Sequence, residues 1–296
     1  MRTIRTVAEL RAALVPERRS GRRIGLVPTM GHFHEGHLSL MRRAREDADF
    51  VVVSLFVNPA QFEESGDLAA YPRDEQRDAA LAAGEGVDLL FVPAAEEVYP
   101  AGFGTVVRVA GLTDVLCGDP RRRGPAHFDG VTTVVTKLFN MVAPEVAYFG
   151  QKDAQQAIVI RRLVCDLDIP VSVEVCPTVR DPDGLALSSR NSHLTPEERE
   201  RALGLSRALA AAEDAVVAGE LEPDTVLATA RAALEGAGVE PEYLELRSAA
   251  DLSPVERVNG STLLAVAARL GRTRLIDNAV LAAGPPPGGH SRGGTG

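Results

Sequence analysis

The ten residues at positions 28–37 (PTMGHFHEGH) are the most informative stretch of this chain. An apolar run at 24–27 precedes them and a helix-like run at 38–45 follows, so the pattern predicts a strand, a turn and the start of a helix. The first turn of a helix carries unpaired N–H groups and partial positive charge. Phosphate binds readily there, and Gly31 and Gly36 let a ligand approach the backbone closely.

Three histidines in this turn, His32, His34 and His37, leave three interpretations open. They could bind a metal ion, they could donate hydrogen bonds to a nucleotide, or they could be loop residues without a chemical role. A zinc site needs further ligands and a fixed second shell, and no nearby residue clearly supplies them. A phosphate at a helix start needs no additional ligands. His34 and His37, three residues apart, are predicted to share one helical face.

Polar side chains also follow two other predicted strands. Asn58 and Gln61 offer neutral donors and acceptors, which suit hydroxyl or carboxylate groups, although Asn-Pro is also a common turn signal. Gly150, Lys152 and Asp153 open another predicted helix. The lysine could contact phosphate and the aspartate could hold a divalent ion that bridges phosphates. The alternative is an ordinary helix start, in which an acidic residue complements the helix dipole.

A polar loop, Ser188-Ser189-Arg190, offers two hydroxyls and a guanidinium that suit a triphosphate, although a hydrophilic linker has the same composition. No single motif decides the function. Taken together, the histidine turn, the Asn/Gln pair, the Gly-Lys-Asp start and this loop predict a nucleotide site beside a neutral pocket.

Short apolar runs alternate with amphipathic stretches, which predicts a Rossmann-like, doubly wound parallel sheet covered by helices on both faces. Ligands of such sheets bind beyond the carboxyl ends of the strands, and the motifs above follow such ends. The predicted strands are 24–27, 50–57, 87–92, 146–149 and 171–175. An apolar helix at 131–142 is expected to pack in a core or an interface.

A second region begins near residue 181. Thr195 is a good helix cap for a helix that reaches about residue 218, and an Ala-rich helix follows at 223–236. Strand-like runs lie near 243–246, 263–266 and 273–276. We therefore expect three segments: an α/β domain at 1–182, a smaller α+β C-terminal domain at 183–283 and a disordered tail at 284–296.

The bulk composition is that of a globular protein of about two domains. The chain has 296 residues, 45% apolar and 25% charged, with a formal net charge of −9, which argues against general nucleic-acid binding. Three widely spaced cysteines favour reduced thiols in the cytoplasm rather than disulfides. No apolar run approaches the roughly 18 residues of a membrane span.

The combined motifs closely resemble the pantoate–β-alanine ligase family, in order, over roughly residues 1–280. The His-x-Gly-His element alone is typical of a broader nucleotidyltransferase superfamily. The segments that carry the resemblance are 28–31 with 34–37, 56–59 with 61–62, 71–73, 127–131, 137–140, 149–156 and 188–191.

The resemblance implies that ATP and pantoate form pantoyl adenylate with Mg²⁺, and that β-alanine then gives pantothenate and AMP. It implies catalytic roles for His34, His37, Lys152, Ser188, Ser189 and Arg190, with His37 as proton donor. The implied ATP contacts are Met30, Gly31, His34, Gly36, His37, Gly150, Gln151, Lys152, Asp153, Val179, Leu187, Ser188, Ser189 and Arg190. Gln61 and Gln156 would hold pantoate, Asn58 would support that pocket, and Asp153 would bind Mg²⁺.

The family resemblance also suggests a homodimer, and a C-terminal domain that closes over the ATP site. The chain departs from the usual family pattern at His32-Phe33, Ala126, Gln151, Ala154 and Leu187, and none of these departures removes a group that is assigned to chemistry. Two other functions remain alternatives: a different nucleotidyltransferase of the same superfamily, and a non-catalytic nucleotide sensor. The first would need a more cationic pocket than Asn58 and Gln61 provide.

Overall fold

The computed structural model describes residues 1–62, 68–69 and 71–282. The tail predicted at 284–296 lies outside these described residues. Within the described part of the chain, no helix is long and apolar enough to cross a membrane.

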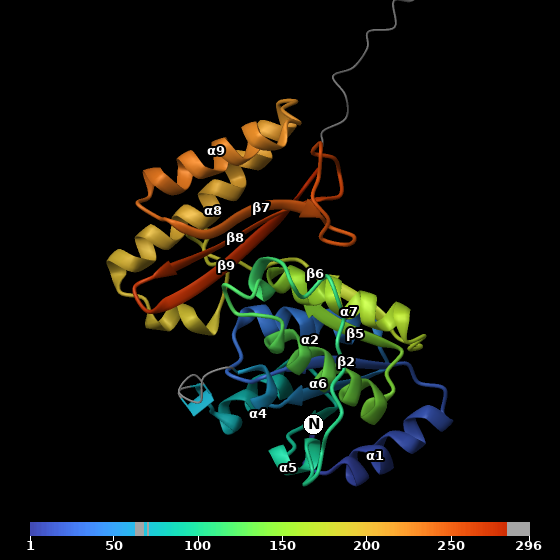
Figure 1. Cartoon of the computed structure of the whole chain (residues 1–296). Coiled ribbons are helices and arrows are strands. Elements are labelled where there is room, and N and C mark those ends of the chain that lie inside the picture. The colour runs from blue at the N-terminus through green and yellow to red at the C-terminus, as the bar shows by residue number, and fades with distance from the viewer. Residues whose placement is uncertain (63–67, 70, 283–296) are drawn as a thin grey trace, which may run out of the picture. The chain divides into compact units, whose positions relative to one another are not determined.

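The chain divides into two compact units (Figure 1). The first unit contains Met1–Asp181 and Ala186–Ser189, and the second contains Pro182–Leu185 and the chain from Arg190 onward. The segment Ala186–Ser189 belongs to the first unit because it pairs with residues of that unit. An antiparallel bridge joins Arg180 to Ala186, so this segment folds back beside the end of the last parallel strand.

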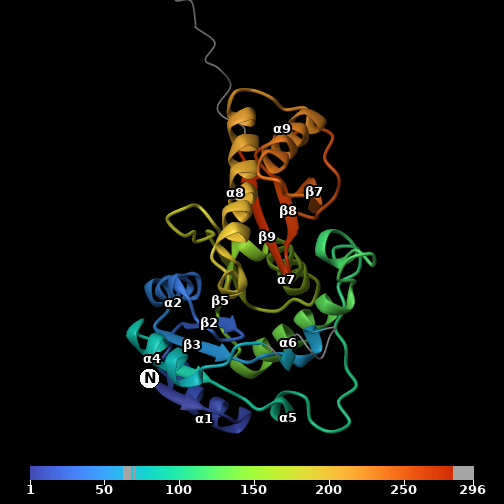
Figure 2. The same ribbon diagram turned by 90° about the vertical axis from the view of Figure 1, so that its left-hand side faces the viewer.

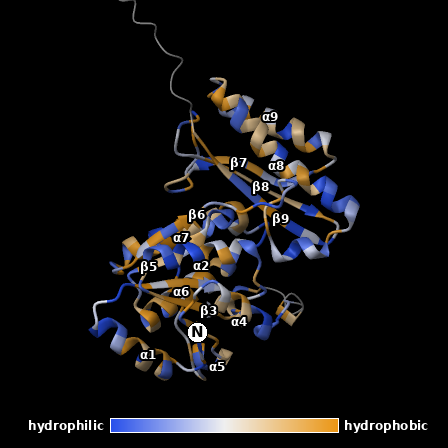
Figure 3. Ribbon diagram, turned by 180° about the vertical axis from the view of Figure 1, so that it is seen from behind, coloured by the Kyte–Doolittle hydropathy of each residue, from blue (hydrophilic) through white to orange (hydrophobic). Residues whose placement is uncertain are grey.

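The first unit is built on a six-stranded parallel sheet in the order β1-β4-β3-β2-β5-β6 (Figure 1). Apolar, β-branched runs form its centre, and successive side chains alternate between two hydrophobic clusters, as Val52 and Val53 do. The strands are mostly coloured as hydrophobic in Figure 3. They are β1 (Arg2–Ile4), β2 (Ile24–Thr29), β3 (Phe50–Leu55), β4 (Leu89–Phe91), β5 (Val146–Gly150) and β6 (Ser172–Cys176).

Helices cover both faces of this sheet. One cluster packs α1 (Val7–Arg19), α6 (Ala126–Val142) and α7 (Ala154–Asp166) on one face. The other packs α2 (Glu35–Asp47) and α4 (Glu75–Gly84) on the opposite face. Shorter elements connect them: α5 (Ala95–Val98) and the 3₁₀ turns η1 (Pro59–Gln61), η2 (Leu116–Gly118), η3 (Gln151–Asp153) and η4 (Ser189–His193). The doubly wound α/β fold predicted from the sequence is confirmed.

The sheet opens where its winding direction reverses. From β2 the chain proceeds outward through β3 to β4, and then returns to β5 on the other side of β2. β2 and β5 pair only at Gly25–Val146 and Leu26–Ala147, so their carboxyl ends lack mutual hydrogen bonds. A crevice at this switch point is where doubly wound sheets bind ligands.

One helix boundary was predicted wrongly. We expected the apolar helix to begin near Val131, but α6 begins at Ala126 and takes in His127 and Gly130. Pro125 occupies the N-cap with φ −71°, and proline's fixed φ suits a helix start. The helix packs into the core of the first unit, so its apolar character needs no partner chain.

The second unit pairs two helices with an antiparallel sheet of order β7-β8-β9 (Figure 2). A capping box between Thr195 and Glu198 starts α8, as predicted. Its buried side chains and those of α9 form a single cluster with the sheet. The elements are α8 (Pro196–Val217), α9 (Pro223–Gly236), β7 (Pro241–Ser248), β8 (Thr262–Leu270) and β9 (Thr273–Leu281).

Candidate active site

The histidine turn lies directly beyond β2 at the switch point. Gly31 and His32 adopt left-handed backbone angles, φ 86° and 54°, and reverse the chain before α2 begins at Glu35. His34 is therefore the N-cap of α2, and our prediction that it shares a helical face with His37 was wrong in detail. The two rings are nevertheless neighbours, with centroids 4.2 Å apart.

Backbone hydrogen bonds determine which ring nitrogen each histidine can offer. Gly36 N–H donates to His34 Nδ1 at 3.1 Å, and His34 N–H donates to His37 Nδ1 at 3.3 Å. Because each Nδ1 accepts, a neutral ring carries its proton on Nε2. Both rings can therefore donate from Nε2–H to a ligand at the start of α2.

The electrostatic environment keeps both rings neutral in the free protein. Burial, followed by the nearby Lys152 ammonium, lowers the pKa of His34 to about 4. Burial, followed by the charge on His34, lowers the pKa of His37 to about 3. A bound polyphosphate would oppose these effects, because its negative charge favours the protonated ring.

A carboxylate that the sequence analysis missed holds the turn in place. Asp78 on α4 is only 1% exposed, and it accepts hydrogen bonds from His32 N–H at 2.6 Å and Phe33 N–H at 2.7 Å. The neighbouring Arg77 donates to Phe33 O at 3.0 Å. In the sequence Asp78 resembles any acidic residue of an amphipathic surface helix, so no local signal marks it.

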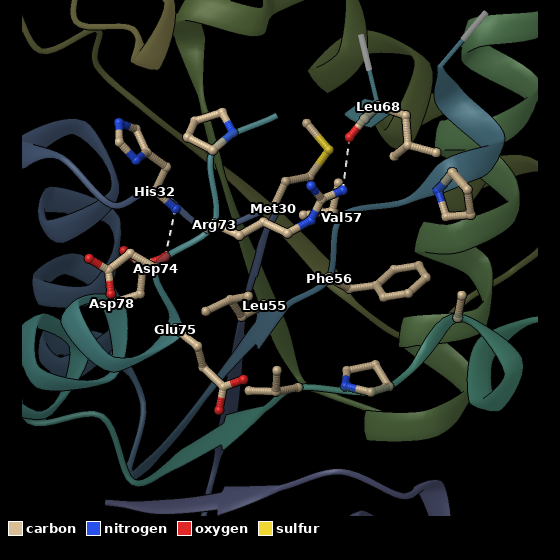
Figure 4. A pocket seen from close by; sticks show the side chains of 16 residues that line it. Met30, His32, Leu55, Phe56, Val57, Leu68, Arg73, Asp74, Glu75 and Asp78 are labelled. Carbon is tan, nitrogen blue, oxygen red and sulfur yellow. Dashed lines mark hydrogen bonds between the residues drawn. The ribbon is translucent and has the colours of Figure 1, made fainter. Parts of the chain in front are cut away.

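A cavity of about 360 Å³ adjoins this turn, beyond the carboxyl ends of β2, β3 and β4. Figure 4 shows Met30 and Arg73 facing its centre and the hydrogen bond from His32 to Asp78 at its margin. Arg73 donates to the carbonyl oxygens of Tyr71 and Leu68, and so its charge is already engaged. The cavity lies beside Met30, and His34 and His37 are not among its lining residues.

Asn58 caps the 3₁₀ turn η1, which follows β3, and Gln61 is the last residue of that turn. Asn58 is 1% exposed and its polar atoms bind groups of the protein, and neither Asn58 nor Gln61 is among the residues that line the cavity. Gln61 is partly buried and accepts a hydrogen bond from Asn58 Nδ2 at 3.0 Å. His127 on α6 contacts the backbone oxygen of Gln61 at 2.8 Å.

In the Gly-Lys-Asp motif Gly150 is the last residue of β5, Lys152 and Asp153 lie in the 3₁₀ turn η3, and α7 begins only at Ala154. The side chain of Lys152 is 19% exposed, and its Nζ lies 3.9 Å from Asp153 Oδ1. The two following glutamines have different roles. Gln155 is buried and bonds the backbone of Leu112, Val115 and Cys117. Gln156 is partly buried and is the one that the sequence analysis assigned to substrate.

The serine loop approaches the same region through a backbone pairing. Leu187 N–H donates to Val179 O at 3.0 Å, which brings together two residues that the sequence analysis assigned to ATP. A Cβ on Gly36 would lie 3.9 Å from Leu187 Cβ, so this pairing lies beside the start of α2. Ser188 and Ser189 belong to the first unit, whereas Arg190 belongs to the second.

The described residues contain no group of three or more His, Cys, Asp and Glu side chains that could hold a metal ion. Asp153, with a side chain 51% exposed, offers one carboxylate near the start of α7. One carboxylate is compatible with Mg²⁺ that is held mostly by substrate phosphates.

Comparisons with known proteins show which family the chain belongs to. The family model described as pantoate-beta-alanine ligase matches residues 2–280. A pantothenate synthetase of Moorella thermoacetica is 54% identical, over 95% of this chain and 99% of its own length.

Solved structures give the same result. The pantothenate synthetase of Thermus thermophilus superposes with a TM-score of 0.89 at 48% identity, covering 95% of this chain and all of that one. The pantoate-beta-alanine ligase of Francisella tularensis, described as complexed with beta-gamma ATP and beta-alanine, has a TM-score of 0.76 at 33% identity, with 95% and 97% covered. This chain belongs to the pantoate–β-alanine ligase family.

Proposed function

We propose that this protein condenses pantoate with β-alanine, at the expense of ATP, through a pantoyl-adenylate intermediate. The observation that carries the proposal is the pair of neutral imidazoles at the start of α2, His34 and His37, whose Nε2–H groups are set by backbone hydrogen bonds. They lie at the switch point of the sheet, and Lys152 is close enough to lower the pKa of both rings. Donors fixed in advance at a helix start suit the charge that develops during phosphoryl chemistry.

In the first step, a carboxylate oxygen of pantoate attacks the α-phosphorus of ATP. The bond from that phosphorus to the bridging oxygen breaks, and pyrophosphate leaves. His34 and His37 donate from Nε2–H to the phosphate oxygens, with His37 as the proton donor, while Lys152 balances the departing charge. Ser188, Ser189 and Arg190 complete the triphosphate site.

The nucleotide contacts extend along the same turn and loops. The proposed set adds Met30, Gly31, Gly36, Gly150, Gln151, Asp153, Val179 and Leu187 to the catalytic residues. The ion Mg²⁺, when bound with ATP, would neutralise phosphate charge, and Asp153 is the residue that would hold it.

In the second step, the amine of β-alanine attacks the acyl carbon, the carbon–oxygen bond to AMP breaks, and the amine loses a proton. Gln61 and Gln156 hold pantoate without a permanent charge. A neutral pocket suits this chemistry, because a cation would bind the reacting carboxylate tightly and weaken it as a nucleophile. Asn58 supports Gln61 through the hydrogen bond between their side chains.

The wider setting of the enzyme is also a proposal. It acts in the cytoplasm as a homodimer. Within the described part of the chain Cys117, Cys165 and Cys176 form no disulfide bonds, which is consistent with a reduced cytoplasmic setting.

Pyrophosphate release tests the proposal. Release from ATP should require pantoate, and AMP should accumulate catalytically only after β-alanine is added. His37→Ala should lose most of the adenylation rate with little loss of pantoate binding. If pantoate fails to stimulate pyrophosphate release, the proposed reaction is wrong; a near-normal rate in His37→Ala would remove only its catalytic role.

A further inference from the structure

The carboxamide of Gln61 is held by a buried network that begins far away in the sequence. Asn58 Nδ2 donates to Gln61 Oε1 at 3.0 Å and to Gly130 O at 3.1 Å. Asn58 Oδ1 accepts from Tyr99 Oη–H at 2.7 Å and from Ala60 N–H at 3.3 Å. All four hydrogen bonds form around a side chain that is 1% exposed.

The backbone decides the orientation of the Asn58 amide. Ala60 N–H can only donate, so it must face Oδ1, and Gly130 O can only accept, so it must face Nδ2. Flipping the amide would set a donor against a donor and an acceptor against an acceptor. The atom of Gln61 that faces Nδ2 must therefore be its oxygen, so Asn58 does not engage the NH₂ group of Gln61.

Tyr99 supplies the shortest bond in this network. It follows α5, about forty positions after Asn58, and its ring contacts Phe56 at a centroid distance of 6.2 Å. Burial raises the pKa of Tyr99 to about 12, against a smaller opposing effect of the bond to Asn58. The hydroxyl therefore remains protonated, and so remains a donor, across the working range of an enzyme.

The backbone of Gln61 is fixed as well. Gln61 N–H donates to Asn58 O at 3.4 Å, and the His127 ring contacts Gln61 O at 2.8 Å. α6 packs so closely on η1 that a Cβ on Gly130 would lie 2.2 Å from Ala60 O. With its main chain held on both sides, the remaining freedom of Gln61 is mainly the orientation of its side chain.

We propose that Tyr99 is a positioning residue which, through Asn58, holds Gln61 with its NH₂ group toward the hydroxy-acid substrate. Gln61 then acts as an obligate donor that selects ligands with acceptor oxygens, an ionised carboxylate or a hydroxyl. This inference rests on the proposed function, because it takes Gln61 as part of the pantoate pocket.

Tyr99→Phe is the primary test, because it removes the hydroxyl and keeps the ring. The loss of one hydrogen bond should raise the KM for pantoate about threefold to tenfold, with little change in kcat or in the KM for ATP. Tyr148→Phe is the matched control. Tyr148 is fully buried in β5, and its hydroxyl contacts Asp47 at 3.4 Å, so its loss should leave the pantoate KM unchanged.

Combining variants separates positioning from a general structural role. In a Gln61→Ala background, Tyr99→Phe should have no further effect on the pantoate KM, since there is no carboxamide left to orient. Asn58→Asp is a second probe, because a carboxylate facing Gln61 Oε1 would favour the flipped amide and raise the pantoate KM more than Tyr99→Phe does. Thermal unfolding of each variant checks that the fold is retained.

The outcomes distinguish the positioning role of Tyr99 from the proposed function of the protein. If Gln61→Ala raises the pantoate KM but Tyr99→Phe does not, the positioning role is refuted and the proposed function stands. If Tyr99→Phe has the same effect with and without Gln61, its role is only structural and the inference fails. If Gln61→Ala itself leaves the pantoate KM unchanged, the proposed placement of Gln61 is wrong and the inference fails with it.

Discussion

Asp78→Asn should disable the ATP site without removing any group that contacts ATP. The two oxygens of Asp78 each accept one backbone N–H, from His32 and from Phe33, at 2.6 and 2.7 Å. An asparagine has only one side-chain oxygen. One N–H would lose its acceptor and would face the new NH₂ group instead.

The magnitude follows from the type of bond that is lost. Hydrogen bonds to charged groups contribute about 1.5–3 kcal/mol, and about 1.4 kcal/mol corresponds to a tenfold change in an equilibrium constant. Gly31 and His32 both have left-handed φ angles, so the shape of the turn depends on these two bonds together with the Arg77 bond to Phe33 O. We therefore expect kcat/KM for ATP in pantoate-dependent pyrophosphate release to fall at least about tenfold.

Asp74→Asn provides a matched control on the same helix. Asp74 is the N-cap of α4 and accepts from Arg77 N–H at 3.0 Å. Asparagine caps helices about as well as aspartate does, so this variant should keep both stability and ATP kinetics. Urea unfolding measures the stability of each variant. If Asp78→Asn loses stability but keeps a normal kcat/KM for ATP, the carboxylate stabilises the fold without positioning the turn, and our reasoning is wrong.

Three further predictions follow from the site. Because burial holds the pKa values of His34 and His37 near 4 and 3, both are neutral at pH 6.5; phosphate charge raises these values, so ATP binding should take up protons and tighten as pH falls toward the free-state pKa values. Calorimetry in buffers of different ionisation enthalpy measures this uptake, and none beyond that of ATP itself would contradict it. Gly130→Ala would place a Cβ 2.2 Å from Ala60 O and should cost about 1–3 kcal/mol in urea unfolding; an unchanged midpoint would refute this close packing. Gln151→Glu adds a negative charge beside the triphosphate and should raise the KM for ATP about twofold to fivefold at limiting Mg²⁺; an unchanged value at every Mg²⁺ concentration would contradict it.

The fold was predictable because its signals are local. Apolar runs such as Val51–Val53 are long enough to mark buried parallel strands, and Thr195 with Glu198 marks a helix start. The exact ends of helices were harder to predict where a proline determines them. Pro125 caps α6, so the helix begins at Ala126, five residues before the apolar run that we took as its start.

The candidate site was only partly predictable, because its supporting contacts join distant positions. The motif at 28–37 predicts the phosphate-binding turn, but Asp78, which holds it, lies 46 positions after His32. Tyr99 lies 41 positions after Asn58 and has no motif of its own. Such residues are fixed by how helices and strands pack, and a single sequence does not display that packing.

The fate of the pantoate carboxylate oxygens tests the proposed reaction most directly. Pantoate labelled with ¹⁸O in its carboxylate is incubated with ATP and β-alanine, and the products are analysed by mass spectrometry. If the carboxylate attacks the α-phosphorus, one labelled oxygen remains on AMP when the amine displaces it, and pyrophosphate carries none. Label in inorganic phosphate, accompanied by ADP, would indicate an acyl-phosphate route and would contradict the adenylate mechanism.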